Sequence, residues 1–474
     1  MRFGIDFGTT RTVIAAVDRG NYPVVPVTDT AGDSHDYIPT VIAQSADGEL
    51  IFGWEAMAEF DNPTLTRSFK RVLSGERVSG TTPVTLDEGL DRPIEEVLTG
   101  FARYVIAAIE AAYPQEPIEV VLGVPANSHS AQRLETMAAF SAAGATVLGL
   151  INEPSAAAFE YSHRHASTLN SKRSSVIVYD LGGGTFDASL VHIDGGYHTV
   201  VATAGIARLG GDDFDQILAE MALAQQGTLF DALPLHEQRN LLREARLTKE
   251  AIAPQTKRVV LETDSVVTIA IGDYYAAAQN LVELTIQAME PLLESRTDIA
   301  GIYLVGGATA LPLVPRILRE RFGRRVHRSP LPSGSTAVGL AIAADGDSGF
   351  SLDEKLSRSI GVFREWDDGS VVSLDELVPA TAEPPMEVSR QYRAAHNVGW
   401  FRYVEYSSQD SADYSLLAEV AVPFEKELVG VDLRQVDVHR TLGGPLVRET
   451  VEVDGDGITT ISIDVPDIDV HITV

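Results

Sequence analysis

Two short turns rich in glycine and threonine constrain the fold of this chain more than any other feature of its sequence. The first is Gly4-Ile-Asp-Phe-Gly-Thr-Thr10, and the second is Asp180-Leu-Gly-Gly-Gly-Thr-Phe-Asp187. Each places a carboxylate at the end of an apolar run that is typical of a β-strand. Glycine allows a tight turn that brings backbone N–H groups close to an anion, and a carboxylate can hold hydrated Mg²⁺ against phosphate oxygens. Each turn therefore predicts a phosphate-binding loop after a strand.

The separation of the two turns, roughly 175 residues, indicates a duplicated fold that closes on one triphosphate from both sides. We expect Asp6 and Asp180 to face the metal ion. The residues expected to donate hydrogen bonds to the phosphates are Gly8, Thr9, Thr10, Gly182, Gly183, Gly184 and Thr185. A plain strand connector would explain either turn alone, because strand–Gly-Gly turns are common, but the two together favour a nucleotide site.

Length and composition exclude several classes of function. With 474 residues the chain is too long for one core, so two or three domains are expected. A formal net charge of −30 opposes binding to nucleic acid or an anionic membrane, since both need a positive surface. The chain has no cysteine, which excludes disulfides, thiolate catalysis and cysteine-ligated metals. The strand expected at 3–7 leaves no room for a signal peptide and no apolar run could span a bilayer, so we expect a soluble, cytoplasmic protein.

The pattern of apolar residues divides the chain into two regions. In residues 1–345, short β-branched runs alternate with longer alanine- and leucine-rich segments, which predicts an α/β fold with parallel strands. The expected strands are 118–124, 176–179, 190–193 and 302–305, and the expected helices are 97–113, 131–143, 212–225, 236–251 and 274–295. Residues 346–357 predict a linker. Residues 358–474 predict an all-β sandwich, with strands at 416–422, 431–438, 447–453 and 458–465 and a hairpin at Asp454-Gly-Asp-Gly457.

Five motifs occur in an order and spacing that match one known family. They are Gly4 to Thr10, Asn152-Glu-Pro-Ser-Ala-Ala-Ala158, Asp180 to Asp187, Leu209-Gly-Gly-Asp-Asp-Phe-Asp215 and Leu304-Val-Gly-Gly-Ala-Thr309. Through these motifs, residues 1–345 resemble the ATPase domain of the heat shock protein 70 (DnaK-type) chaperones. The resemblance implies an actin-like fold, a duplicated ribonuclease H-like fold in which two lobes surround a cleft that holds Mg²⁺ with ATP or ADP.

The resemblance also assigns roles to single residues. Lys70, in Ser68-Phe-Lys-Arg-Val-Leu73, matches the lysine that orients the attacking water and contacts the γ-phosphate. Glu153 matches a glutamate that reaches the metal through water, and Asp187 matches an aspartate near the nucleophilic water. The implied catalytic set is Lys70, Glu153, Asp180, Thr185 and Asp187, with Mg²⁺ held largely through water by Asp6, Glu153 and Asp180. The implied nucleotide-binding set adds to the two turns Arg11, Gly210, Gly211, Lys249, Gly306, Gly307 and Ala308.

The half of the site that would hold adenosine departs from the family pattern. Ala310 stands where the family places an arginine that stacks on adenine, and Arg246 and Ala253 replace a glutamate and a serine that contact adenosine. Losing such donors weakens base recognition, by roughly 1–3 kcal/mol where a buried partner is left unpaired. ATP remains the expected nucleotide, and hydrolysis should be slow because such groups mainly position water and neutralise charge. Pro125 and Arg133 match the proline switch and the relay arginine of the family.

Residues 358–474 resemble, more weakly, the β-sandwich peptide-binding domain of the same family. The matching segments are 359–362, 377–380 and 454–457. The chain ends within a strand pattern, from which a sandwich without the family's helical lid is expected. The linker segment 350–356 is polar where the family has a run of leucines, and Gly149 replaces an arginine that family members use toward J-domain partners. We expect the module to bind extended apolar polypeptide; a β-module that only caps the ATPase is the alternative.

Together these features predict a chaperone of the heat shock protein 70 type, in which ATP binding docks the β-domain and hydrolysis releases it and tightens peptide binding. The alternative is a nucleotide-dependent scaffold or regulatory protein whose β-module binds one specific partner. A sugar kinase of the same superfamily would need a small-substrate pocket, and the chaperone form of the second turn argues against it. The expected partners are unfolded or extended polypeptide, a J-domain co-chaperone and a nucleotide exchange factor. Nucleic acid and membrane are not expected.

Three other clusters favour ordinary structure over a functional site. His163 and His165 alternate in a polar segment, which predicts a loop and not a metal site. Asp454-Gly-Asp-Gly457 lacks the full set of oxygen ligands of a calcium loop, which favours a plain hairpin. Ser128 and Ser130 flank a histidine, but the glycines of a nucleophile elbow are missing around them.

Overall fold

The computed structural model describes residues 1–474 with the exception of residues 60, 61, 63, 76, 77, 87–89, 115, 116, 127, 207, 263, 264, 295, 354, 355, 357, 367–370 and 407–413. Residue 295 of a predicted helix and residues 354, 355 and 357 of the predicted linker therefore lie outside the described residues. The chain divides into two compact units. The first comprises Met1–Val41, Ala108–Ala126 and Ile151–Leu352, and the second comprises Ile42–Ala107, Asn127–Leu150 and Asp353–Val474. The domain boundaries predicted at 345 and 358 stay a prediction.

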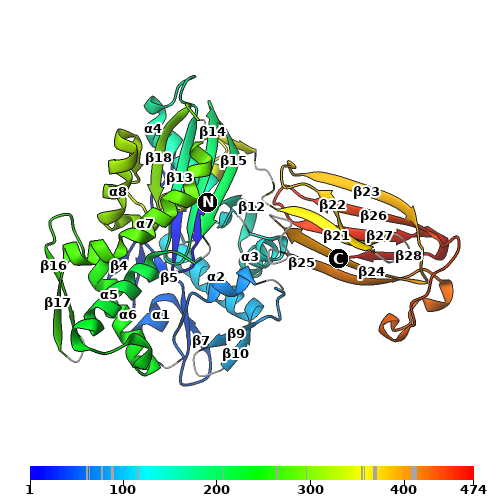
Figure 1. The fold of residues 1–474 in the computed structure, drawn as a ribbon, viewed down its shortest axis with the longest axis horizontal. Coiled ribbons are helices and arrows are strands. Elements are labelled where there is room, and N and C mark those ends of the chain that lie inside the picture. The colour runs from blue at the N-terminus through cyan, green and yellow to red at the C-terminus, as the bar shows by residue number, and fades with distance from the viewer. Residues whose placement is uncertain are drawn as a thin grey trace. The chain divides into compact units, whose positions relative to one another are not determined.

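A mixed sheet in the first unit leads into the first glycine turn (Figure 1). Its central strand β1 (Arg2–Phe7) pairs in parallel with β11 (Glu119–Val124) and antiparallel with β2 (Arg11–Ala16). Strand β5 (Ile38–Pro39) continues the sheet beyond β2. Because β1 and β2 form a hairpin, the residues between them are held as a tight turn at the end of a buried strand.

One helix covers this sheet and packs against a second helix. Helix α9 (Ser335–Ala344) packs across β1, β2 and β11, and α4 (Glu153–His165) packs against α9. The two helices approach so closely that a Cβ on Gly339 would lie 1.7 Å from the carbonyl oxygen of Ala156. Only glycine fits at that position, since any side chain would push the helices apart.

The second glycine turn follows a second mixed sheet of the first unit. Strand β13 (Ser175–Leu181) pairs in parallel with β18 (Ile299–Val305) and antiparallel with β14 (Phe186–Asp194). Strand β15 (Tyr197–Ile206) pairs with β14, and β19 (Val326–Arg328) pairs with β18. A central strand with one parallel neighbour and one hairpin partner therefore occurs twice, as a duplicated fold would have it.

Helices and a hairpin complete the first unit around a large apolar core that includes Tyr179, Phe186, Phe214 and Ile286. These elements are α5 (Gly211–Gln226), α6 (Leu235–Glu250), α7 (Ile271–Leu293), α8 (Leu313–Phe322), β16 (Arg258–Glu262) and β17 (Val266–Ala270). Helix α7 lies across the face of the second sheet and contacts β14 and β15 (Figure 1). The sequence alternation that predicted these helices reflects one buried face on each.

The second unit begins with short elements around α2 (Ile94–Ala112), whose amphipathic pattern buries Val97, Phe101 and Val105. The other elements of this part are β6 (Val41–Gln44), β7 (Leu50–Phe52), α1 (Gly53–Ala58), β8 (Thr66–Arg67), the 3₁₀ helix η1 (Phe69–Ser74), β9 (Pro83–Leu86), β10 (Leu90–Pro93), α3 (Ser130–Ala142) and β12 (Thr146–Asn152).

The rest of the second unit is a sandwich of two antiparallel sheets (Figure 1). In the described part of the chain, one sheet has the order β22-β21-β24-β25 and the other the order β23-β26-β27-β28. The strands are β21 (Ser359–Trp366), β22 (Val371–Val378), β23 (Met386–Arg393), β24 (Val398–Tyr406), β25 (Ser415–Pro423), β26 (Leu446–Val453), β27 (Thr459–Val465) and β28 (Val470–Thr473). Alternate residues point inward, so that Val362, Tyr403, Val451 and Ile463 meet in one core.

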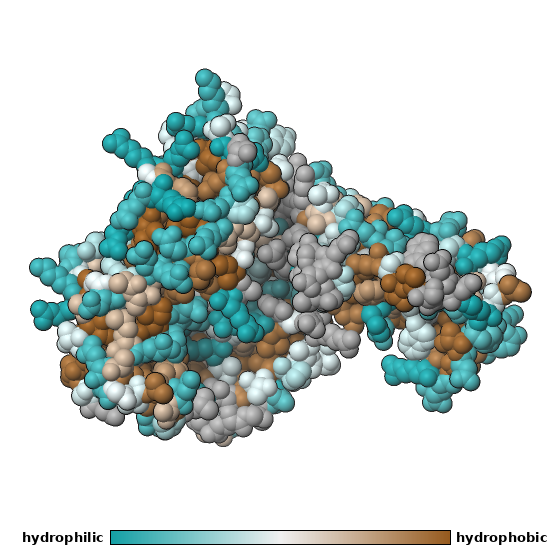
Figure 2. Space-filling view, in the orientation of Figure 1, coloured by the Kyte–Doolittle hydropathy of each residue, from teal (hydrophilic) through white to brown (hydrophobic). Residues whose placement is uncertain are grey.

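The visible surface is mostly hydrophilic, with apolar residues in small groups among charged and polar ones (Figure 2). Within the described ranges, no helix is both long enough and apolar enough to cross a membrane.

The α/β region followed by an all-β region is confirmed, but three local predictions are wrong. The sheets are mixed and not purely parallel, because hairpins extend each parallel pair. Residues 431–438 form no strand: they contain the 3₁₀ turn η9 (Leu433–Gln435), in which the Asp432 carboxylate accepts a hydrogen bond from Arg434 N at 3.2 Å. Such a local side-chain bond competes with strand pairing. His163 and His165 lie in the last turn of α4 and not in a loop.

The predicted polar linker is also partly ordered. Its residues 351–353 form β20 (Ser351–Asp353), which adjoins β15 at the edge of the second sheet. Next to it, the ring of Phe350 packs 5.7 Å from Phe159 and 5.5 Å from His198, measured between ring centroids. The N–H and C=O groups at the edge of a sheet can pair with another strand whatever its side chains, so a polar segment can also form a strand there.

Candidate nucleotide site

The first glycine turn is tightly closed. Thr40 donates from Oγ1 to the carbonyl oxygen of Gly8 at 2.9 Å and from its backbone N to that of Thr10 at 3.0 Å. A Cβ on Gly8 would lie 2.5 Å from the carbonyl oxygen of Arg11, so a larger residue would open the turn. Thr9 lies inside the same turn. The backbone of this loop is thus held in one conformation by partners outside it.

The second turn lies directly against the first. Gly182 N donates to the carbonyl oxygen of Thr185 at 3.0 Å, which closes the turn between β13 and β14. A Cβ on Gly183 would lie 2.5 Å from Cγ2 of Thr10. The two turns, which are far apart in the sequence, therefore meet as predicted, and the absence of a side chain at Gly183 allows their close approach.

A third glycine loop packs against the second turn. Gly211 N donates to the carbonyl oxygen of Gly182 at 2.9 Å, and Asp212 N donates to that of Gly183 at 2.7 Å. A Cβ on Gly210 would lie 2.5 Å from Gly184 N. These bonds seat the N-terminus of α5, where backbone N–H groups and the helix dipole favour a negative charge, beside the two turns.

Carboxylates cluster beside the turns. Burial raises the pKa of Asp180 well above its usual range, and the neighbouring carboxylates of Glu153, Asp187 and Asp6 raise it further. Burial, together with Glu153, raises the pKa of Asp187 to about 7, although a hydrogen bond with the Thr185 side chain opposes the shift. Like charges gathered in a buried place favour a bound cation, because the cation removes their mutual repulsion.

The donor set fits Mg²⁺ bound mainly through water. Mg²⁺ prefers carboxylate oxygens and keeps several of its waters. Among the described residues, no three histidine or acidic side chains are arranged to ligate one metal ion directly. Asp6, Glu153 and Asp180 would therefore hold the ion through its hydration shell, and the ion would supply positive charge opposite the phosphates.

The loop that follows β18 closes on Asp180. Gly306 has a φ of +82°, and a Cβ there would lie 2.2 Å from Asp180 Oδ1. Gly307 begins the 3₁₀ helix η4 (Gly307–Ala310). Ala308 is buried, and its Cβ lies 3.5 Å from the position that a Cβ on Gly211 would take. The predicted nucleotide-binding loops at Gly210 and Gly306 thus lie on the same site as the turns.

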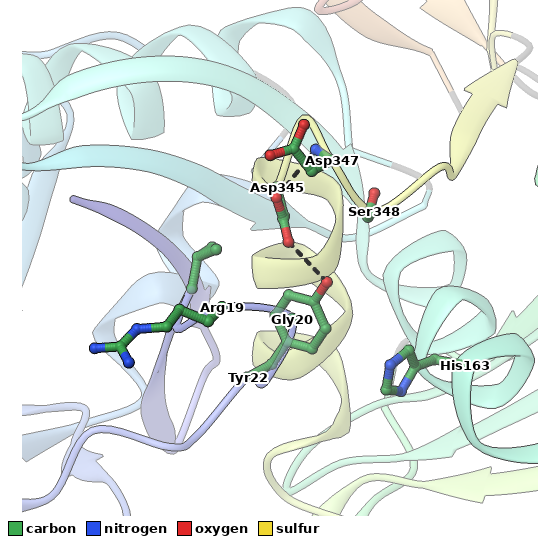
Figure 3. Close-up of a pocket in the computed structure, with 8 residues that line it drawn as sticks. Arg19, Gly20, Tyr22, His163, Asp345, Asp347 and Ser348 are labelled. Atoms are coloured by element: carbon green, nitrogen blue, oxygen red, sulfur yellow. Dashed lines mark hydrogen bonds between the residues drawn. The ribbon is translucent and has the colours of Figure 1, made fainter.

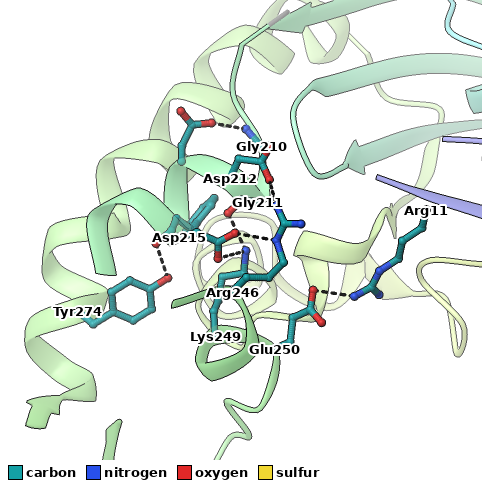
Figure 4. A network of polar contacts seen from close by, with 11 residues as sticks. Arg11, Gly210, Gly211, Asp212, Asp215, Arg246, Lys249, Glu250 and Tyr274 are labelled. Atoms are coloured by element: carbon teal, nitrogen blue, oxygen red, sulfur yellow. Dashed lines mark hydrogen bonds and ion pairs between the residues drawn. The ribbon is translucent and has the colours of Figure 1, made fainter. Parts of the chain in front are cut away.

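Ion pairs engage Arg246 and Lys249, two residues at positions where the family contacts adenosine by prediction (Figure 4). Lys249 Nζ lies 2.6 Å from Asp215 Oδ1 and donates to the carbonyl oxygen of Gly211 at 2.6 Å. Arg246 pairs with Asp212 at 2.6 Å and with Asp215 at 3.3 Å. Burial raises the pKa of Asp215, and its two cationic partners offset that only in part. Sequence reasoning missed this network; the spacing of acids on α5 and bases on α6 was its only signal.

Arg11 is engaged by protein groups in this structure. Its Nη2 lies 2.6 Å from Glu250 Oε1, and its guanidinium lies 4.5 Å from the centroid of the Tyr37 ring. Figure 4 shows the side chain reaching from β2 toward the end of α6. The predicted contact of Arg11 with nucleotide stays a prediction.

Two predicted residues lie in the second unit. Lys70 is in η1 and is 4% exposed. Arg133, on α3, donates from Nη1 to the carbonyl oxygen of Asp456 at 3.0 Å. Their predicted roles toward the nucleotide stay predictions.

A separate pocket of about 470 Å³ lies in the first unit between the end of β2, α4 and the end of α9 (Figure 3). Tyr22 donates to Asp345 Oδ2 at 2.9 Å across it, and burial together with that bond raises the pKa of Tyr22 to about 12. His163 lines the pocket, with its ring 5.5 Å from that of Tyr22. The pocket shares no residue with the glycine turns, so it is not part of the nucleotide site.

Comparisons with known proteins identify the family of this chain. Residues 93–395 match the family model described as Hsp70 protein. The chain is 29% identical over 500 residues to a chaperone protein HscA homolog of Laribacter hongkongensis and 30% identical over 502 residues to one of Burkholderia ambifaria, in both cases over 97% of this chain and 75% of the relative. It is 34% identical over 366 residues to a chaperone protein DnaK of Thermotoga neapolitana, over 72% of this chain and 58% of the relative. The chain therefore belongs to the Hsp70 protein family.

Proposed function

We propose that this protein is an Hsp70-type chaperone that binds Mg-ATP at the paired glycine turns, hydrolyses it slowly and binds extended polypeptide with its β-sandwich. The observation that supports this most is the contact between Gly183 and Thr10 beside the cluster of buried carboxylates. A duplicated pair of phosphate turns around such a cluster is suited to a triphosphate and its cation. Membership of the Hsp70 protein family supports the proposed actin-like fold and the proposed chaperone class.

In the proposed reaction, the protein positions a water and neutralises charge. Backbone N–H groups of both turns hold the phosphates, and Mg²⁺ supplies charge neutralisation when it is bound. Asp187, whose pKa lies at about 7, would accept a proton from the attacking water near neutral pH. Lys70 would orient that water and contact the γ-phosphate. With no covalent intermediate and few groups at work, slow turnover is the expected rate.

ATP is the proposed nucleotide, with a weakened hold on the base. Lys249, which matches the family's ribose-contacting lysine, is already bound to Asp215 and Gly211. Ala310 has no guanidinium to stack on adenine. We infer that the phosphates and Mg²⁺ provide most of the binding free energy.

Coupling between nucleotide and polypeptide would use contacts within the second unit. Asp456, in the hairpin between β26 and β27, accepts a hydrogen bond from Leu150 N at 2.8 Å. The guanidinium of Arg133 binds the Asp456 carbonyl oxygen. A Cβ on Gly149 would lie 3.2 Å from Asp456 Oδ1. These contacts join the sandwich to the segment before the Asn152-Glu153 motif, which is a physical route for coupling.

The partners proposed from the family are unfolded or extended polypeptide, a J-domain co-chaperone and a nucleotide exchange factor. The test is binding of the full chain to a library of apolar peptides, with and without ATP and Mg²⁺. We expect binding to several extended peptides, with affinity that falls when ATP is added. Binding to one folded partner, and to none of the peptides, would refute the chaperone proposal in favour of a nucleotide-dependent scaffold.

A further inference from the structure

A buried carboxylate of the sandwich binds the start of α3. Glu405, on β24, is 5% exposed. Its Oε2 accepts a hydrogen bond from Ser130 N at 3.0 Å, and its Oε1 accepts one from Ser130 Oγ at 2.5 Å. Ser130 is the first residue of α3. Glu405 therefore caps this helix from outside, where the free N–H groups and the helix dipole favour a negative charge.

The residue before Ser130 is a histidine that caps the same helix. His129 is the N-cap of α3, and its Nδ1 accepts a hydrogen bond from Gln132 N at 3.2 Å. A nitrogen that accepts carries no proton, so the ring is neutral, with its proton on Nε2. Protonation of Nδ1 would remove this acceptor and place a positive charge at the positive end of the helix. The neutral ring is thus the form that suits the observed start of α3.

The balance of influences on the ring also favours its neutral form. His129 is 8% exposed, and burial is the largest influence on its pKa. Glu405 of β24 favours the charged form, while Arg358, which precedes β21, disfavours it. The backbone of Leu73 and Gly75, at the end of η1, favours the charged form to a smaller extent. The net effect lowers the pKa of His129 below its ordinary value of 6.5.

We propose that His129 makes the docking of the β-sandwich on α3 dependent on pH. Neutral His129 holds the start of α3 in the form that Glu405 binds, and protonated His129 releases it. Undocking exposes the ring to water and returns the pKa of His129 toward 6.5, so the undocked state binds the proton more readily. Docking should therefore be strongest above pH 6.5 and weaken as the pH falls below it, by at most about tenfold per pH unit for one proton.

The test measures docking directly in the full chain. Because the chain has no cysteine, two introduced cysteines can be labelled specifically for fluorescence energy transfer. Glu55→Cys in α1 and Ser389→Cys in β23 place the labels at exposed positions on the two sides of the contact. We expect the transfer efficiency to fall when the pH is lowered from 7.5 to 5.5. His129→Asn should remove that fall, because asparagine is a good N-cap and does not titrate in this range.

Two controls separate His129 from other causes. Far-UV circular dichroism should stay constant from pH 7.5 to 5.5, which excludes general unfolding, and His129→Gln serves as a second variant if the asparagine protein misfolds. In Glu405→Gln, which keeps the shape but not the charge of the carboxylate, the fall on acidification should persist. A pH response that survives in His129→Asn, or that disappears only in Glu405→Gln, would overturn the proposal. So would a transfer efficiency that is flat, or that rises in acid, in the otherwise unaltered chain. The measurement is made both without nucleotide and with saturating Mg-ATP, so that an effect of nucleotide on docking, which belongs to the proposed function, is separated from the effect of pH.

Discussion

Gly306 is the position at which one added methyl group should disturb the nucleotide site most. Its φ of +82° is a left-handed conformation, and a Cβ there would lie 2.2 Å from Asp180 Oδ1 and 2.4 Å from the carbonyl oxygen of Leu181. For Gly306→Ala, the backbone conformation costs about 1–2 kcal/mol. Crowding against the rigid backbone of Leu181 adds about 1–3 kcal/mol. We predict a loss of roughly 2–5 kcal/mol in the free energy of unfolding.

Gly307→Ala is the matched control. No heavy atom lies within 4 Å of a Cβ built on Gly307, so its stability should change by no more than about 0.5 kcal/mol. Urea denaturation followed by circular dichroism measures the stabilities, and ATP turnover against Mg²⁺ concentration measures the site. Because the methyl group of Gly306→Ala would displace the Asp180 carboxylate, that variant should also need more Mg²⁺ for half-maximal turnover. If the two alanine variants are equally stable and equally active, the close contact between Gly306 and Asp180 is wrong.

Three further predictions concern the same site. Lys70→Ala and Asp187→Asn should each abolish most ATP turnover in a steady-state assay while nucleotide binding persists by calorimetry, and unchanged turnover in both would contradict the assigned chemistry. The pKa of Asp187 is raised to about 7, so its contribution to stability is complete below pH 3.8 and is lost as the pH rises toward 7. Without Mg²⁺ and nucleotide, Asp187→Asn should therefore have a higher urea midpoint than the unaltered protein at pH 8 but not at pH 4. Equal midpoints at pH 8 would show that burial of the Asp187 carboxylate does not destabilise the protein. Asp215→Asn should lower the free energy of unfolding by about 3–5 kcal/mol, because it leaves the cations of Lys249 and Arg246 without their buried partner. The control Glu290→Gln, at the exposed pair with Arg321, should lower it by less than about 1 kcal/mol. Similar urea midpoints for these two variants would refute the buried network.

Most helices and strands of this protein could be predicted from local patterns. The helix expected at 212–225 is α5 (Gly211–Gln226), and the strand expected at 118–124 is β11 (Glu119–Val124). Each has an apolar period that its own residues display. Residues 431–438 were misjudged as a strand because their valines alternate as in a strand, while the Asp432 side chain favours a turn that periodicity does not register.

The linker and the histidines show a different limit. Polarity predicted a linker at residues 346–357 but gave no sign that β20 would adjoin β15, because strand pairing depends on backbone groups that every sequence has. His163 and His165 were expected in a loop, since α4 continues through a polar segment that has no apolar face of its own. In both cases the deciding partner lies elsewhere in the fold.

The two glycine turns could be predicted from the chain alone, because a tight glycine turn after a strand depends on residues within a few positions of one another. The repetition of that turn led us to expect the two turns on one site, and Gly183 does lie against Thr10. The polar partners of buried charges could not be predicted in this way. Glu405 meets Ser130 across 275 positions of the chain, and no local pattern in either segment identifies the other. Such residues meet only when packing of the apolar cores fixes the positions of the strands and of the helix ends. These contacts are therefore determined by the tertiary structure and not by any local pattern in the sequence.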